Sequence, residues 1–172
     1  MSQLPMDMKS ICLTVLFLTT ISCEQDDSTS HAHNDSENIA AELCEHMAEG
    51  PSIAVFASAE TTNLPDVSTP HTRFDVTLVA DESGTWSGSV RYASPGTGDL
   101  RLATSKTIDV TLTAPDGSTV VAMPDAMAST CADIPKLISF PVSVGPYTLS
   151  FGPSDTADVK IVIELDDGNE SN

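Results

Sequence analysis

Basic residues are scarce in this chain of 172 residues. It has 7 Lys and Arg residues against 25 Asp and Glu residues, which gives a formal net charge of −18. Contacts with the phosphates of nucleic acids or anionic lipids require clustered Lys and Arg side chains, and the few in this chain do not cluster. The composition therefore argues against both partners. The acidity favours solubility, with binding of calcium or of a cationic partner as the alternative.

Sequence signatures of common catalytic sites are also missing. The chain has no GxSxG motif, no HExxH motif and no Gly-rich phosphate loop. The nearest approach is Gly84 to Gly88, in which Ser87 stands one position away from the nucleophile spacing and inside a strand pattern. We therefore expect a protein that is not an enzyme.

No apolar stretch is long enough to cross a membrane as a helix. The longest one runs from Ile11 to Leu18, after Lys9, and it gives way to small polar residues that end at Cys23. A membrane span needs about 20 apolar residues, whereas the apolar part of a secretory signal has roughly 7–15. Residues 1–22 are therefore predicted to be an export signal, with Met1, Met6 and Met8 as the alternative starts.

The end of this signal, Ile21-Ser22-Cys23, resembles the lipobox of bacterial lipoproteins, although Thr20 stands where that family usually has Leu. The resemblance implies that Cys23 is diacylated and becomes the N-terminus, so that the protein is anchored to a membrane through lipid. Glu24 after the cysteine implies sorting to the outer membrane. Thr20 and Ser22 also satisfy an ordinary signal peptidase, which leaves a soluble secreted or periplasmic product as the alternative.

Two of the four cysteines remain after processing and acylation. Cys12 lies in the signal and Cys23 is the lipid site, which leaves Cys44 and Cys131 in a compartment that oxidises thiols. We predict that they form a disulfide, which would stabilise the fold by about 4 to 5 kcal/mol on the chain-entropy estimate. The alternative is that they are two ligands of a metal site, but CxxC and CxxH spacings are absent.

The exported chain divides into four parts. Residues 23–36 lack large apolar side chains and are predicted to be a disordered tether. Residues 37–49 are predicted to be a helix docked on the domain, because the apolar residues recur with helical period; they are Ile39, Ala40, Leu43, Cys44 and Met47. A β-sandwich domain follows over residues 50–167, and residues 168–172 form an acidic tail.

The domain is predicted from alternating apolar residues, which are typical of half-buried strands. About nine short segments alternate in this way: Ile53–Ala57, Phe74–Leu78, Trp86–Tyr92, Leu100–Leu102, Ile108–Leu112, a short one around Val120, Ile138–Val144, Tyr147–Phe151 and Val159–Leu165. Short strands at this spacing, each with one apolar face, predict an all-β fold, a single antiparallel, jelly-roll-like sandwich preceded by one short helix.

Two stretches resemble the prepeptidase C-terminal type of β-sandwich, an accessory module of secreted bacterial proteins. They are Asp109 to Gly117, a strand that ends in a Pro-Asp-Gly turn, and Phe140 to Phe151 with Gly145-Pro146-Tyr147. The chain is also similar to small bacterial envelope lipoproteins in which a His-bearing tether precedes Cys-x-His and Gly-Pro. These resemblances imply a non-catalytic binding or stabilising role.

All four histidines precede residue 72. His31 and His33 form an HxH pair among carboxylates, and this donor set suits zinc or copper(II); the alternative is a solvated polar linker. His46 is expected to be an exposed helix residue paired with Glu42, and His71 a capping or edge residue at the start of a strand. Either could instead join His31 and His33 in one metal site if the tether folds back onto the helix.

The sequence thus leaves two functions open. The first is a non-enzymatic envelope lipoprotein whose β-sandwich acts as a binding or accessory module for an unknown envelope protein. The alternative is periplasmic or extracellular binding of zinc or copper through the N-terminal histidines, with no other cofactor implied. Convergence of the histidines in space would favour the second.

Overall fold

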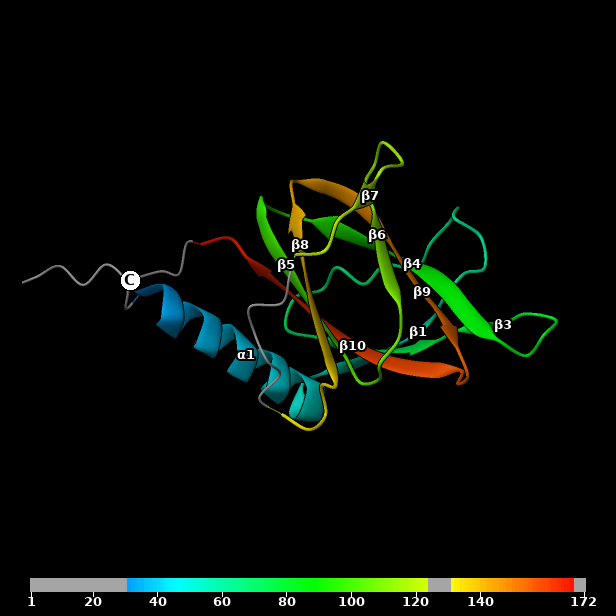
Figure 1. Ribbon diagram of the computed structural model, residues 1–172, viewed down its shortest axis with the longest axis horizontal. Helices are drawn as coiled ribbons and strands as arrows, with labels where there is room; N and C mark the ends of the chain where they lie inside the picture. The colour runs from blue at the N-terminus through cyan, green and yellow to red at the C-terminus, as the bar shows by residue number, and fades with distance from the viewer. Residues whose placement is uncertain (1–30, 124–130, 169–172) are drawn as a thin grey trace, which may run out of the picture.

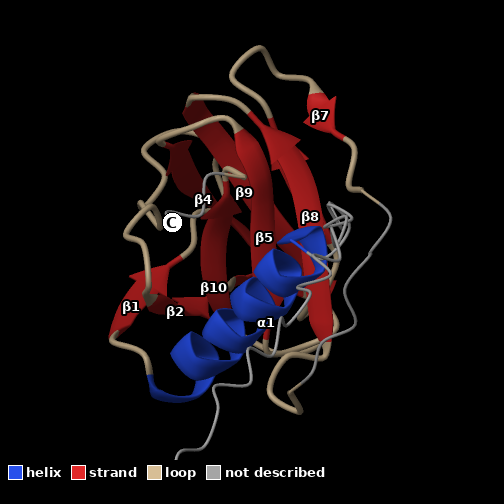
Figure 2. Ribbon diagram, turned by 90° about the vertical axis from the view of Figure 1, so that its left-hand side faces the viewer, coloured by secondary structure: helices blue, strands red, loops and turns tan. Residues whose placement is uncertain are grey.

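The computed structural model describes residues 31–123 and 131–168, with side chains from Ile39 onward. A helix, α1 (His31–Glu49), precedes ten strands that form two sheets of five strands each. The two sheets face each other, and α1 lies across the outside of one of them (Figures 1 and 2). The all-β sandwich with one short helix is therefore confirmed. Within the described residues, no helix has the length and apolar character needed to span a bilayer.

The first sheet carries the helix. Its strands, in spatial order, are β1 (Ser52–Phe56), β2 (Arg73–Thr77), β10 (Asp158–Asp166), β5 (Gly98–Thr104) and β8 (Lys136–Val142). All its pairings are antiparallel except that of β1 with β2, which is parallel. The prediction of an antiparallel sandwich is wrong at this edge. The connection of 16 residues (57–72) is long enough to bring the chain back to the starting end of β1, so that β2 runs in the same direction.

The second sheet closes the sandwich from the other side. Its strands, in spatial order, are β3 (Val79–Ala80), β4 (Trp86–Ser94), β9 (Gly145–Ser154), β6 (Val110–Thr113) and β7 (Thr119–Val120). The two-residue β3 was not predicted, because two residues are too few to show alternation. The other nine strands correspond to the nine predicted segments.

The main core lies between the two sheets and consists of the inward side chains of both. Its most deeply buried large members are Phe74, Phe140, Leu100, Leu102, Leu112, Leu149 and Ile161. Two predicted core residues are not part of it. Ile53 is 43% exposed because it lies on an edge strand, and Val144 is 70% exposed in the turn between β8 and β9.

A second, smaller apolar cluster fixes α1 to the outer face of the first sheet. Ile39, Leu43 and Met47 of the helix are buried in this cluster. They pack against Ala103 of β5, Leu137 of β8, Val162 of β10 and Ile134 in the loop before β8. The predicted disulfide between Cys44 and Cys131 is present at this cluster and joins residues 87 positions apart, with their Cα atoms 6.0 Å from each other. The helix is thus a separate layer on the sandwich.

Helix α1 begins before its predicted start and ends at its predicted end. It starts at His31 rather than Glu37, so the predicted tether is shorter by residues 31–36, where no Pro or Gly interrupts the helix. It ends at Glu49, and Gly50 follows, donating its N–H to the carbonyl of His46 at 3.1 Å. A Cβ on Gly50 would lie 2.7 Å from that carbonyl oxygen, so the chain needs glycine there.

Candidate metal centre

Four side chains converge beside the last turns of α1. Glu42 and His46 come from the helix and are four residues apart, so they lie on one face. His71 precedes β2, and Glu164 belongs to β10. One donor atom from each of the four residues lies within 4.8 Å of all the others, and the group could hold a metal ion.

The two imidazole nitrogens lie at the centre of this group. His46 Nε2 is 3.2 Å from His71 Nδ1, 3.5 Å from Glu42 Oε1 and 3.8 Å from Glu164 Oε1. His71 Nδ1 is 2.9 Å from Glu42 Oε1 and 3.6 Å from Glu164 Oε1. The predicted pairing of His46 with Glu42 is therefore one contact of a larger arrangement.

The side chains of the cluster differ in their exposure to solvent. Those of Glu164 and His46 are 10% and 16% exposed, whereas those of Glu42 and His71 are 33% and 60% exposed. The site therefore has a buried floor, made by β10 and the helix, and an open side at His71 through which an ion can enter.

Glu164 occupies the outer face of β10 because strand residues alternate between faces. Ile161 and Ile163 point into the main core, while Val162 and Glu164 point to the side that the helix covers. Arg101 is directly opposite Glu164 in the neighbouring strand, but its guanidinium contacts Ser139 at 2.6 Å and Asp166 at 3.0 Å. In the described part of the chain no ion pair joins Arg101 to Glu164, and the groups within ion-pair distance of this carboxylate are the two imidazoles.

His71 is held in the turn before β2 in a conformation that few side chains adopt. Its φ is +51°, in the left-handed region, which is uncommon for residues other than glycine. The buried Thr72 hydroxyl donates to the carbonyl of Pro70 at 3.0 Å, and Arg73 donates from Nη1 to the carbonyl of Met47 at 3.1 Å. The residues around His71 thus attach its turn to the end of α1.

The four side chains satisfy one another only in part: His46 Nε2 and His71 Nδ1 share a hydrogen bond of 3.2 Å. Each imidazole nitrogen carries at most one proton, yet each has three donor or acceptor atoms around it. Glu164 Oε1 is buried and has no hydrogen-bond partner. Burial raises the pKa of Glu164, and the charge of Glu42 raises it further, although both imidazoles and the backbone N–H of His71 act in the opposite direction. A bound cation would relieve this unfavourable arrangement.

The structure thus brings together two of the four predicted histidines. His46 and His71 are in the cluster, while the side chains of His31 and His33 lie outside the described residues, as does Cys23. The sequence analysis treated Glu42 only as a partner of His46 and missed Glu164. The available signal was Val162, an apolar residue on the supposedly solvated face of a strand, which indicates that another element covers that face.

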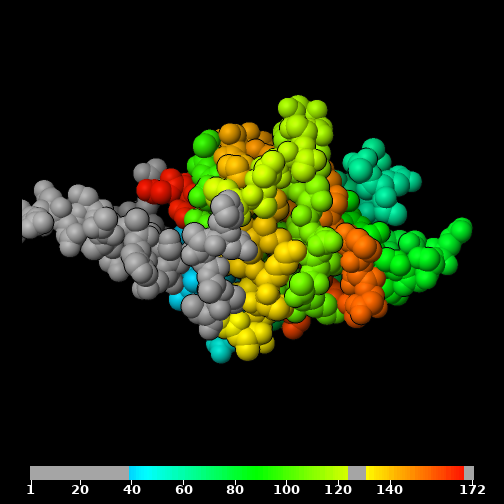
Figure 3. Space-filling model, viewed as in Figure 1, coloured from blue at the N-terminus to red at the C-terminus, as the bar shows by residue number. Residues whose placement is uncertain are grey.

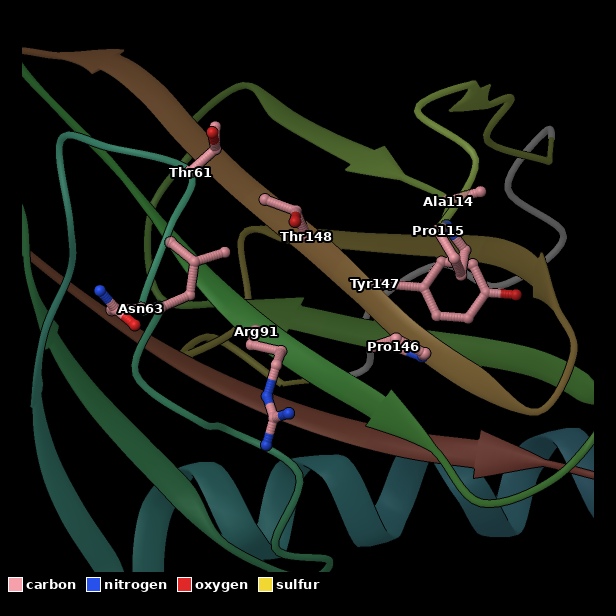
Figure 4. Close-up of a pocket in the computed structure, with 9 residues that line it drawn as sticks. Thr61, Asn63, Arg91, Ala114, Pro115, Pro146, Tyr147 and Thr148 are labelled. Atoms are coloured by element: carbon pink, nitrogen blue, oxygen red, sulfur yellow. The ribbon is translucent and has the colours of Figure 1, made fainter.

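Two other surface features, a hollow on the second sheet and a pair of projecting turns, lack comparable chemistry. A hollow of about 420 Å³ on the second sheet has Pro115, Pro146 and Tyr147 at one end and Thr61 and Asn63 at the other (Figure 4). The positively charged side chain that lines this hollow, Arg91, forms an ion pair with Asp66 at 2.6 Å, so its charge is already balanced.

The other feature is a pair of projecting turns, between β3 and β4 and between β6 and β7 (Figure 3). Asp81 and Asp116 accept hydrogen bonds from Ser83 and Ser118 in these turns, which lowers the pKa of both carboxyls. Their carboxylates therefore have local structural partners, and neither turn resembles the cluster around His46.

Comparison with known proteins adds nothing to this geometry, because no protein-family model matches the chain and no curated protein is similar to it. The candidate site therefore has to be judged on its own chemistry.

Proposed function

We propose that this protein binds a transition-metal ion, zinc first and copper(II) second, at the cell envelope. The observation that carries the proposal is the convergence of two imidazole and two carboxylate donors, one of which is a buried carboxylate oxygen without a hydrogen-bond partner. Imidazole ligands suit zinc and copper, whereas calcium and magnesium prefer oxygen ligands alone.

The spacing of the donors supports zinc over copper(II). Zinc with ligands at about 2.0–2.1 Å in a tetrahedron requires donors about 3.3 Å apart, and five of the six donor pairs lie between 2.9 and 3.8 Å. A square-planar copper site requires two opposite pairs, each about 4.0 Å across. No two opposite pairs of this cluster reach that separation together.

This proposal favours the alternative function of the sequence analysis, with a different set of ligands. The proposed ligands are Glu42, His46, His71 and Glu164, which include two of the four predicted histidines; the side chains of His31 and His33 are outside the described part of the chain. The sandwich then acts as a rigid support that holds two of the ligands, and it needs no catalytic residue. A role as an accessory module for an envelope protein stays a prediction.

Zinc titration of the purified mature protein tests the proposal directly. We expect one zinc ion per chain, bound at micromolar or lower free zinc at pH 7.5, as measured by calorimetry and native mass spectrometry. Imidazole ligands must be neutral to bind, so affinity should fall steeply between pH 7.5 and pH 5.5. Absence of binding at pH 7.5, or a calcium affinity that exceeds the zinc affinity, would contradict the proposal.

The envelope location is proposed on the signal and lipobox-like residues 1–23 alone. We expect wild-type protein to fractionate with membranes through a diacylated Cys23, and Cys23→Ser to prevent acylation, because serine lacks the thiol that receives the lipid. Mass spectrometry of the N-terminal peptide and membrane fractionation measure both effects. Identical fractionation of the two forms would leave the soluble exported product as the correct alternative.

A further inference from the structure

The proposed metal ligands come from two parts of the molecule, the helix and the sandwich. Glu42 and His46 are on α1, while His71 and Glu164 are on the sandwich. The apolar cluster under the helix is separate from the core between the sheets. Undocking of the helix would therefore leave the core between the sheets intact and would divide the metal site in half.

The disulfide lies on the same helix at the opposite side of its apolar face. With 100° per residue, Leu43 is at the centre of that face, His46 and Glu42 are 60° and 100° to one side, and Cys44 is 100° to the other. The buried side chains of Ile39 and Met47 lie between these margins. A bond at one margin and an ion at the other would hold the helix on both sides.

The contacts at the metal margin are mixed when no ion is bound, because His46 and Glu42 of the helix contact His71 and Glu164 of the sandwich. Glu42 and Glu164 also place two carboxylates within 4.8 Å of each other, and the buried Oε1 of Glu164 has no hydrogen-bond partner. On the other margin the disulfide joins Cys44 to Cys131 across 87 residues of sequence. This covalent bond keeps the helical ligands at a high effective concentration beside His71 and Glu164.

We propose that the Cys44–Cys131 disulfide controls the affinity of the Glu42, His46, His71 and Glu164 site, so that the oxidised protein captures the metal ion and reduction releases it. This inference rests on the proposed metal-binding function. Reduction by a thiol or phosphine breaks the S–S bond and yields two thiols, while the reductant becomes a disulfide or a phosphine oxide. Because the coupling between two equilibria is reciprocal, bound metal must also stabilise the oxidised state.

The test compares zinc affinity in the presence and absence of the disulfide. The disulfide-free form is the double variant Cys44→Ala with Cys131→Ala, which avoids creating thiols that could bind zinc themselves. We expect its zinc affinity, measured by competition with a chelator at pH 7.5, to be at least about tenfold weaker than that of the oxidised wild-type protein. Equal or tighter binding by the double variant would overturn the inference.

Leu112→Ala is the matched control for a general loss of stability. Leu112 is fully buried in the core between the sheets, on a strand of the second sheet, so its truncation destabilises the fold by an amount similar to loss of a disulfide without touching the helix. Its zinc affinity should equal that of the wild type. If Leu112→Ala loses as much affinity as the double variant, the effect is not specific to the disulfide and the inference is wrong.

A second measurement decides the matter if the double variant does not fold. Oxidised wild-type protein is treated with a phosphine with and without zinc, and the released thiols are alkylated and counted by mass spectrometry. Zinc should slow reduction several-fold, and it should have no effect in the His46→Ala variant; an unchanged rate in the wild type would overturn the inference. Wild-type protein that binds no zinc at all would instead refute the proposed function itself, and the coupling with it.

Discussion

Replacing His46 with alanine should lower zinc affinity at least 100-fold, and His71→Ala should have an effect of similar size. Each imidazole nitrogen lies within 3.8 Å of the other three donors, so each would supply one of the four ligands of the proposed metal site. Loss of an outer-shell partner already costs about 10–100-fold in metal affinity, and loss of a direct ligand costs more. Calorimetric titration with zinc at pH 7.5 measures the effect.

Glu45→Gln is the matched control for these variants. Glu45 is exposed on the same helix, one residue before His46, and it is not part of the donor cluster. Removing its charge should leave zinc affinity within about twofold of the wild type. An equal loss in Glu45→Gln and His46→Ala would mean that general acidity, rather than the cluster, attracts the ion.

The HxH pair needs a separate variant, His31→Ala with His33→Ala. If the metal binds at the cluster, this variant should bind zinc as tightly as the wild-type protein does. If the pair rather than His46 proves essential, the metal site lies at the start of α1, as the sequence analysis predicted.

Glu164→Gln should abolish tight zinc binding and yet stabilise the metal-free protein. Because the pKa of Glu164 is raised in the fold, the native apoprotein holds a proton there at pH values at which the unfolded chain has lost it. The ionised carboxylate therefore lowers stability at pH 7, and this cost disappears as the pH falls towards 4.5, the ordinary value. The neutral amide removes the cost, by an amount on the order of 1 kcal/mol.

Urea unfolding of the metal-free proteins at pH 7 and at pH 4 measures this effect. Glu164→Gln should exceed the wild type in stability at pH 7 and lose most of that advantage at pH 4. Saturating zinc should reverse the order, because only the wild-type protein gains stability from binding. If Glu164→Gln is less stable than the wild type at pH 7 without metal, Glu164 stabilises the fold through other contacts and the account of the site is wrong.

Much of the fold was predictable because local rules and tertiary structure agree. Alternation such as Phe74, Val76 and Leu78 identifies strands, since one face of each strand must be buried. The predictions of burial and of strand direction were wrong at the edge of the first sheet. Ile53 alternates like a core residue but lies on an edge strand, and β1 pairs in parallel with β2, because exposure and strand direction depend on neighbours far along the chain.

The β-sandwich, the end of the helix and the pairing of Cys44 with Cys131 could be predicted from the amino-acid sequence alone. Each follows from a periodicity or from the elimination of other thiols. The candidate metal centre required the folded chain, because its residues come from a helix, a turn and a strand separated by up to 122 positions (Glu42 to Glu164). Glu164 in particular looks like a solvated strand residue until α1 covers it. Burial of its Oε1 without a hydrogen-bond partner then favours a nearby cation, and no local pattern in the sequence indicates that burial.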